Sequence, residues 1–172
     1  PWSNVSNVPF RMHKSWVHEG GISTPLIAHW PNGIETQGLV HEARHVVDIM
    51  PTILEATSAP YPHDFDGHGV QDLDGESLVP LFRDVTSPRE QPIFWEHEGN
   101  CGVRSGNWKL VREFGSDWEL YNMADDRTEL NDLRHGDADR ASFLATTFEA
   151  WAEDVGVIDW AILKEHPAMD WH

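Results

Sequence analysis

The sequence predicts an α/β protein, in which the end of an α/β core is followed by a small antiparallel sheet with a C-terminal helix packed against it. The core is indicated by a short apolar run at residues 25–30, which stops at a Pro-Asn-Gly turn. Strand-like runs joined by Gly and Asn turns, between residues 92 and 123, indicate the sheet. The helix is indicated by apolar residues at spacings of four, three and four: Leu144, Phe148, Trp151 and Val155.

Within the predicted core, residues 25–30 form a short buried strand, and the next helix begins at Asp48. Aspartate is a favoured N-cap because its side chain accepts a hydrogen bond from an unpaired helical N–H. Pro51 fits the first turn, where its missing N–H would have had no partner. One face of this helix is lined by Ile49, Ile53 and Ala56.

Residues 58–76 are rich in Pro, Gly and Asp and are predicted to form a long loop, after which Ser77 caps a short helix. In the strand-rich part, the pair Gly106-Asn107 suits a tight hairpin turn. Asp137 is the predicted cap of the C-terminal helix. The chain therefore divides into the end of the core (1–57), a connecting loop with a short helix (58–91) and a C-terminal subdomain (92–172).

The charge balance limits the partners. Twelve Lys and Arg against 29 Asp and Glu give a net charge of −17. Such a surface repels polyanions, which argues against nucleic acid or an anionic membrane as the main partner, and a sulfated or phosphorylated ligand needs a local basic pocket. No apolar run is long enough to span a membrane. The nine tryptophans fit packing between subdomains or a sugar-stacking surface.

The chain contains the motif H-E-x-x-H at His41, Glu42 and His45. On one helical turn this motif would present two imidazoles to a zinc ion, and the carboxylate would act as base on a metal-bound water. A helix that begins at Asp48 leaves both histidines outside it. The extended form of the motif also needs glycine at position 48 and histidine at 51, where the chain has Asp48 and Pro51. A zinc metallopeptidase is therefore the less favoured alternative.

A basic stretch stands out in this acidic chain. Residues 11–18 contain Arg11, His13, Lys14 and His18, and the first acid is Glu19. The pair Gly20-Gly21 then leads into the predicted strand. Paired glycines let the backbone take unusual dihedrals or approach a ligand closely, and α/β folds place ligands at such strand ends. The stretch predicts an anion site built on the Lys14 ammonium, although a solvated basic loop with a glycine turn explains the composition equally well.

Residues 10–34, which begin F-R-M-H-K-S-W-V-H-E-G-G, resemble the lysine–EGG segment of the type I sulfatases, the arylsulfatase family of the alkaline phosphatase superfamily. In that segment a lysine stands five residues before the glutamate, as Lys14 does before Glu19. Other family segments are similar, in the family's order, to residues 45–57, 73–82, 94–111 and 118–133. The resemblance covers roughly residues 2–155, and it implies the C-terminal portion of a sulfatase with an alkaline-phosphatase-like core.

This resemblance implies hydrolysis of sulfate esters by a hydrated formylglycine, with a calcium ion and basic residues holding the sulfate. It implies that Lys14 contacts a sulfate oxygen, and Lys14 is thus the expected catalytic and substrate-binding residue. His97, at a strand end beside Glu98 and Asn100, is expected at the substrate-binding rim of the pocket, and ordinary hydrogen bonds at a strand end would explain it equally. The residues expected to shape or support the loop are His18, Glu19, Gly20 and Gly21.

The chain lacks the rest of the family's machinery. Cys101 is not the nucleophile, because a C/S-x-P-S-R maturation motif would need proline and arginine where the chain has Val103 and Ser105. The family's calcium ligands, an Asp-Asp pair and an Asp-Asn pair, have no counterpart, so no metal ligand is predicted here. We therefore expect the nucleophile and the calcium site in an N-terminal remainder upstream of Pro1, and we expect the isolated chain to be inactive.

Further alternatives remain open. The tryptophans suit a non-catalytic module that binds sugars or a partner protein. A phosphatase relative in the same superfamily is also consistent with the residues present. The natural substrate (aryl or carbohydrate sulfate), the oligomeric state and the compartment stay open. The family resemblance makes a periplasmic or secreted location plausible.

Overall fold

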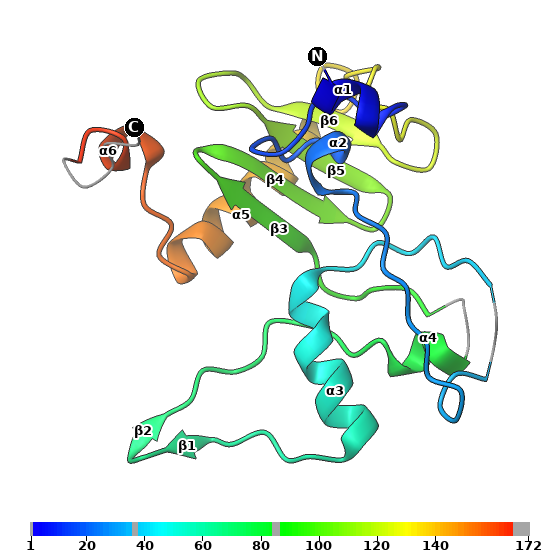
Figure 1. Ribbon diagram of the computed structural model, residues 1–172. Helices are drawn as coiled ribbons and strands as arrows, with labels where there is room; N and C mark the ends of the chain where they lie inside the picture. Colours follow the sequence, from blue (N-terminus) through cyan, green and yellow to red (C-terminus); the bar gives the residue numbers. More distant parts are fainter. Residues whose placement is uncertain (1, 36–37, 84–86, 167–172) are drawn as a thin grey trace. The chain divides into compact units, whose positions relative to one another are not determined.

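The computed structural model describes residues 2–35, 38–83 and 87–166 (Figure 1). The chain forms two compact units. One unit combines residues 1–25 with 92–172, and the other contains residues 26–91. The predicted mixed α/β class, with a small antiparallel sheet and a C-terminal helix, is confirmed. Among the described residues, no helix has both the length and the apolar character that a membrane crossing needs.

The first unit is built on a four-stranded antiparallel sheet in the order β3-β4-β5-β6. Its strands are β3 (Ile93–His97), β4 (Asn100–Ser105), β5 (Trp108–Arg112) and β6 (Glu119–Asn122). The predicted hairpin turn at Gly106-Asn107 joins β4 to β5, and Gly106 has a positive φ of 56°. A second tight turn, Glu98-Gly99, joins β3 to β4 with φ values of 54° and 78°.

Helix α5 (Ala138–Asp154) packs on one face of this sheet. Asp137 is its N-cap, as predicted, since the side chain accepts a hydrogen bond from the N–H of Arg140. Leu144 and Phe148 are buried against the sheet, as the helical spacing predicts. Their sheet partners in this core cluster are Cys101, Val103, Leu110 and Leu120.

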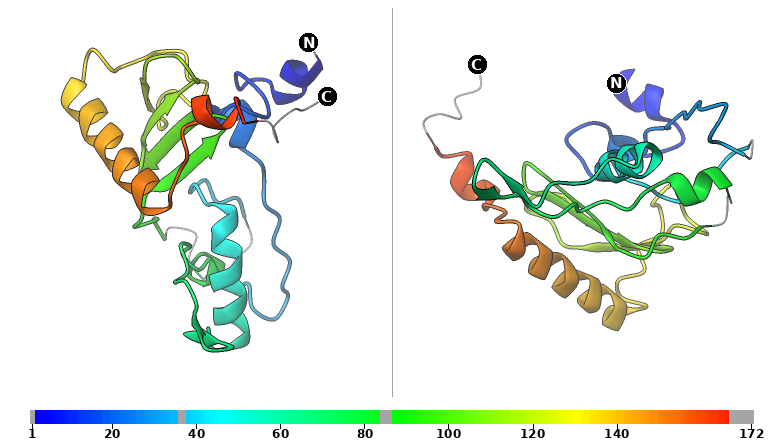
Figure 2. Two further views of the ribbon diagram at one scale, coloured as in Figure 1. Left: turned by 90° about the vertical axis from the view of Figure 1, so that its left-hand side faces the viewer. Right: turned by 90° about the horizontal axis from the view of Figure 1, so that it is seen from below.

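The opposite face of the sheet is covered by the N-terminal segment (Figure 2, right). Here Val17 packs with Val111, Tyr121 and Met123, and Ile22 and Trp95 pack around them. Because side chains alternate along a strand, Leu110 faces α5 whereas Lys109 and Val111 face the N-terminal segment. The short helices of this unit are α1 (Trp2–Asn7), α2 (Glu19–Ile22) and α6 (Trp160–Leu163).

The second unit contains a short 3₁₀ turn, η1 (Val46–Asp48), followed by α3 (Ile49–Thr57). Pro51 lies in the first turn of α3, as predicted. The loop predicted for residues 58–76 also contains a small exposed hairpin of β1 (Asp64–Phe65) and β2 (His68–Gly69). Helix α4 (Val79–Arg83) follows, and the Ser77 hydroxyl accepts a hydrogen bond from the N–H of Val79 at 3.2 Å, in agreement with the predicted cap.

The predicted buried strand at residues 25–30 is wrong for this structure. The segment is extended, but no strand is assigned to it, and Leu26 and Ile27 are 62% and 90% exposed. A strand requires a hydrogen-bonded neighbour, and no strand of the described chain pairs with this segment.

The prediction for Asp48 also needs correction. It stands at the N-cap of α3, but its side chain makes no cap hydrogen bond. Its buried carboxylate instead accepts the N–H groups of His45 (2.8 Å) and Glu76 (2.9 Å) and pairs with Arg89 Nη1 at 2.6 Å. These bonds tie the start of α3 to Glu76 and Arg89 of the same unit. On α3 itself the predicted apolar face is exposed at Ile49 and Ile53, and the most buried side chain is Thr52.

The Lys14 loop as a candidate functional site

The Lys14 loop, defined as residues 11–18, lies between α1 and α2. It belongs to the first of the two units, which contains the four-stranded sheet and is called the sheet unit below. The side chain of Lys14 is exposed, and its ammonium makes no hydrogen bond or ion pair with any residue that the structure describes. Next to it, the ring of His13 contacts the ring of Trp16, with centroids 4.6 Å apart. A free cation in a chain of net charge −17 is available to bind an anion.

The backbone on either side of Lys14 is in an uncommon conformation. Met12 and Ser15 have φ values of 68° and 83°, in the left-handed region that non-glycine residues seldom occupy. Each such residue costs on the order of 1–3 kcal/mol and persists only where its surroundings hold it. The Met12 carbonyl accepts a hydrogen bond from Asn7 Nδ2 at 3.2 Å, and the Ser15 carbonyl accepts one from Asn100 Nδ2 at 2.8 Å.

Gly20 and Gly21 allow the Lys14 loop to fold tightly onto α2. A Cβ atom on Gly20 would overlap the carbonyl oxygens of Arg11 and Met12, and one on Gly21 would overlap the carbonyl oxygen of Trp16. The Gly20 N–H donates to the Arg11 carbonyl at 3.0 Å. The close approach therefore takes place between two parts of the chain's own backbone, which is how the glycine pair shapes the loop.

Glu19 anchors the segment to the sheet through a buried ionic cluster. Lys109 Nζ, on β5, lies 3.1 Å from Glu19 Oε1 and 2.7 Å from Glu129 Oε1, and all three side chains are almost fully buried. Glu129 Oε2 also accepts the backbone N–H of Glu19 at 2.8 Å. Burial alone would raise the pKa of the Glu19 carboxyl, but Lys109, with Arg104 and Arg127, lowers it below its ordinary value of 4.5. Glu19 therefore holds the loop in place as a carboxylate.

The loop after β6 presents Glu129 to this cluster. Asp126 accepts the N–H groups of Leu130 (2.9 Å) and Asn131 (2.8 Å), which closes the chain into a tight turn around Glu129. Glu129 itself has a φ of 56° and is fully buried. The segment 118–133, which resembles a family segment, thus supports the Lys14 loop through the contacts of Glu129 with Glu19 and Lys109, a role that its sequence alone does not reveal.

His18 is buried beneath the loop, with only 1% of its surface exposed. Its Nε2 lies 3.2 Å from Glu119 Oε2, and the same carboxylate oxygen accepts the Tyr121 hydroxyl at 2.6 Å and lies 3.3 Å from Arg11 Nη1. His18 therefore contacts the sheet rather than solvent, which fits a supporting position.

His97 is exposed at the end of β3. The Asn100 amide that holds the Ser15 carbonyl also donates to the His97 carbonyl at 3.0 Å. The fold thus brings the two predicted substrate-contacting residues, Lys14 and His97, to the same end of the sheet although they are 83 positions apart in the sequence.

Comparisons with known proteins identify the family of this chain. The family model described as N-sulphoglucosamine sulphohydrolase, C-terminal, matches residues 10–148. This chain belongs to that family. An uncharacterized sulfatase of Schizosaccharomyces pombe is 30% identical over 164 residues, which cover 91% of this chain and 30% of that protein. Human arylsulfatase A is 33% identical over 105 residues, or 58% of this chain and 19% of that protein.

The fold is also that of solved structures. The crystal structure of Ps i-CgsB superimposes with a TM-score of 0.72 at 23% identity, covering 85% of this chain and 32% of that one. The chain thus spans about a third or less of the length of the relatives that it matches, and it matches only their C-terminal part.

The residues present do not fit the calcium ion and the formylglycine of the sulfatase family. Within the described residues, no group of three or more His, Cys, Asp or Glu is arranged to hold a metal. Cys101 is buried in β4, where burial raises the pKa of its thiol, and it lies in no maturation motif. His41 and His45 lie outside the helices, so the H-E-x-x-H motif lacks its helical geometry.

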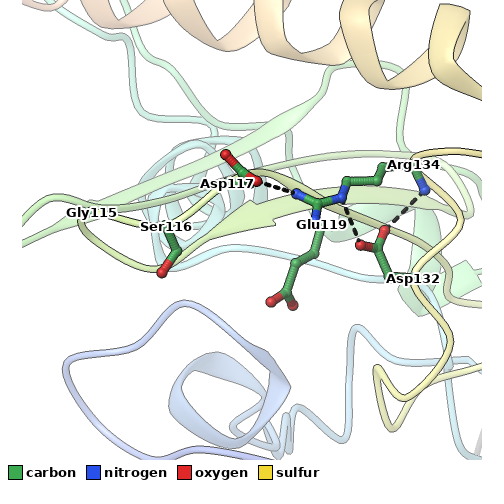
Figure 3. A pocket seen from close by; sticks show the side chains of 6 residues that line it. All are labelled: Gly115, Ser116, Asp117, Glu119, Asp132 and Arg134. Carbon is green, nitrogen blue, oxygen red and sulfur yellow. Dashed lines mark hydrogen bonds and ion pairs between the residues drawn. The ribbon is translucent and has the colours of Figure 1, made fainter.

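A shallow polar pocket of about 360 Å³ lies at the turn between β5 and β6 in the sheet unit (Figure 3). Arg134 stands between Asp117 and Asp132, at 3.2 and 3.1 Å, so its charge is already neutralised. Glu119 also lines this pocket. A pocket with three carboxylates and one paired cation repels an anion, so it is not the sulfate site.

Because of Glu119, the free energy of unfolding of the sheet unit should decrease as the solution becomes acidic. The hydrogen bond from His18 is the main cause that lowers the pKa of Glu119 to about 2; burial opposes it, and Tyr121 and Arg11 add to it. A lowered pKa contributes stability above the ordinary value of 4.5, and this contribution is lost as the pH falls toward 2. We expect the urea midpoint to fall across this range, and to fall less steeply in Glu119→Gln. Identical slopes for the two proteins would contradict this role.

Proposed function

We propose that this chain is the C-terminal part of an enzyme that hydrolyses sulfate esters, and that the Lys14 ammonium binds an oxygen of the sulfate group. The observation that carries the proposal is a free ammonium on a loop whose backbone is fixed on both sides. The family assignment and the names of the relatives, all sulfatases, support the reaction class.

In this proposal Lys14 acts through its charge. As the ester bond breaks, negative charge grows on the leaving-group oxygen and on the sulfuryl oxygens. A cation beside these oxygens stabilises this charge more in the transition state than in the ground state, and the backbone that carries it is already held on both sides by hydrogen bonds to the Met12 and Ser15 carbonyls. His97, at the same end of the sheet, contributes to the rim that binds the alcohol part of the substrate.

The remaining groups are proposed to lie in the rest of the protein, because the described residues do not fit them. There a formylglycine would supply the nucleophile and a calcium ion would hold the sulfate. The N-terminal remainder is also proposed to cover the apolar groups that the second unit exposes: Leu26 and Ile27 of the extended segment, and Val46, Ile49, Met50 and Ile53 around the start of α3.

Substitution of Lys14 tests the proposal in the complete protein. Lys14→Ala should lower kcat about 10²- to 10³-fold, comparable to removal of one oxyanion-stabilising donor. The measurement is hydrolysis of nitrophenyl sulfate. Arg140→Ala is the control, because Arg140 is an exposed cation of the same unit on α5, which packs on the other face of the sheet from the Lys14 loop, and it should leave kcat unchanged. The 172-residue chain alone should show no turnover.

Two results would count against the proposal. Retention of more than about a third of kcat in Lys14→Ala would remove Lys14 from the reaction, since the loss of a contact to a developing charge costs far more. Hydrolysis by the isolated chain that disappears in Lys14→Ala would mean that the nucleophile lies within these residues after all.

A further inference from the structure

We propose that Asn100 is a positioning residue for Lys14, and that Asn7 is a second, weaker clamp on the same loop. The inference rests on the proposed function, because it assigns to Asn100 an effect on catalysis that is exerted through Lys14. Neither asparagine was singled out by the sequence as acting on the lysine.

The need for clamps follows from the backbone. Lys14 lies between Met12 and Ser15, which both have left-handed φ values that their side chains disfavour. Without restraint, each would relax toward an ordinary conformation. A backbone rotation at Ser15 or Met12 would change the direction of the Lys14 side chain. No contact of the ammonium with a described residue would oppose this change.

Asn100 restrains the C-terminal side of the loop. It is 7% exposed, and its Nδ2 donates to the carbonyl oxygens of Ser15 (2.8 Å) and His97 (3.0 Å). Its Oδ1 accepts the N–H of Phe114 at 3.0 Å. Two carbonyl partners and one N–H partner fix which amide atom is nitrogen and which is oxygen. Asn100 thus connects the Lys14 loop to the β3 end that carries His97.

Asn7 restrains the N-terminal side. Its Nδ2 donates to the Met12 carbonyl at 3.2 Å from a half-buried position in α1. The longer hydrogen bond and the greater exposure make this clamp the weaker of the two. The two amides therefore hold the carbonyl groups of the two left-handed residues on either side of Lys14.

Catalysis is sensitive to such restraint, because a misplacement of about 1 Å costs about 100-fold in rate. Asn100→Ala removes the clamp, and Asn100→Asp turns a donor into a carboxylate that faces two carbonyl oxygens. In the complete protein we expect either variant to lower kcat about 10- to 100-fold, with a smaller change in KM. Asn7→Ala should lower kcat about 3- to 10-fold, in keeping with its weaker hydrogen bond.

The decisive measurement is a double-mutant cycle on kcat. If Asn100 acts through Lys14, Asn100→Ala should change kcat less than about 2-fold when Lys14 is already alanine. Asn122→Ala is the control: this asparagine also donates to an oxygen (Asp125 Oδ2, 2.6 Å) and accepts an N–H (Ala124, 3.2 Å), but it lies at the end of β6, outside the Lys14 loop. It should leave kcat unchanged in both backgrounds.

The outcomes separate the two proposals. Equal losses from Asn100→Ala with and without Lys14 would overturn the positioning role and leave the proposed function intact. A Lys14→Ala variant with normal kcat would overturn the proposed function itself, and the inference with it. If Asn100→Ala does not fold, the same cycle is measured with Asn7→Ala. Removal of the half-buried Asn7 side chain takes a hydrogen-bond donor from the Met12 carbonyl. Additive losses in kcat from Asn7→Ala and Lys14→Ala would overturn the paired-clamp arrangement.

Discussion

Replacing Lys109 with methionine is expected to destabilise the sheet unit by about 3–5 kcal/mol, the usual cost of removing one partner from a buried ion pair. Methionine fills a similar volume but leaves Glu19 and Glu129 facing each other without a cation. The measurement is urea unfolding at pH 7, with the free energies extrapolated to water. Arg127→Met is the matched control, because Arg127 pairs with the same Glu19 from a side chain that is 49% exposed, and it should cost about 0.5 kcal/mol or less.

The sign of the pH dependence provides a second test of the same cluster. In the natural chain the pKa of Glu19 is lowered, so its contribution is present above the ordinary value of 4.5 and is lost in acid. Without Lys109, burial dominates and the pKa of Glu19 should rise above 4.5. Lys109→Met should then become more stable as the pH falls from 7 toward 5. A variant that loses stability over this range would contradict the ionic account of the cluster.

Asp48→Ala is expected to destabilise the second unit by about 3–5 kcal/mol, because it leaves the Arg89 guanidinium buried without its carboxylate. It also removes the acceptor of the His45 and Glu76 N–H groups. Burial would raise the pKa of Asp48, but its hydrogen bonds, above all those from Arg89, lower it, so the side chain is a carboxylate at neutral pH. Asp48→Asn keeps an acceptor and should cost less.

Hydrogen exchange would locate this effect. Since residues 26–91 form a unit of their own, Asp48→Ala should increase exchange in α3 and around Leu78, whose N–H donates to Thr52 Oγ1 at 2.8 Å. The amides of β4 and β5 should keep their protection. Equal loss of protection in the sheet would show that the two units unfold together.

Local patterns predicted much of the fold. Gly106-Asn107 and Asp137 act through contacts a few residues away, so the hairpin and the start of α5 follow from the sequence. The strand at residues 25–30 does not, because a strand depends on a partner, and no strand of the described chain pairs with this segment. Asp48 illustrates another limit: its type and position indicate a cap, but a buried arginine 41 residues later takes its carboxylate.

The sequence pointed to some residues of the candidate site, and their roles stay predictions. The resemblance placed attention on Lys14 and Glu19, and the structure brings His97 to the same end of the sheet through Asn100. Lys109 was missed, although a lysine between Trp108 and Leu110 in a strand buried on both faces needs an acidic partner. No sequence pattern pairs Lys109 with Glu19, because these residues meet only after the sheet has formed.

The four strands are hairpin neighbours in sequence order, so the sheet forms from contacts of low sequence separation. The N-terminal segment instead reaches this sheet across separations of 85 to 110 residues, through Asn100, Lys109 and Glu129. Its docking must close a chain loop that includes all of residues 26–91, with the entropy cost that this entails. During refolding, the amides of the β-meander should therefore become protected from exchange early, and the Lys14 loop should become ordered late. Mild denaturant should release the Lys14 loop first.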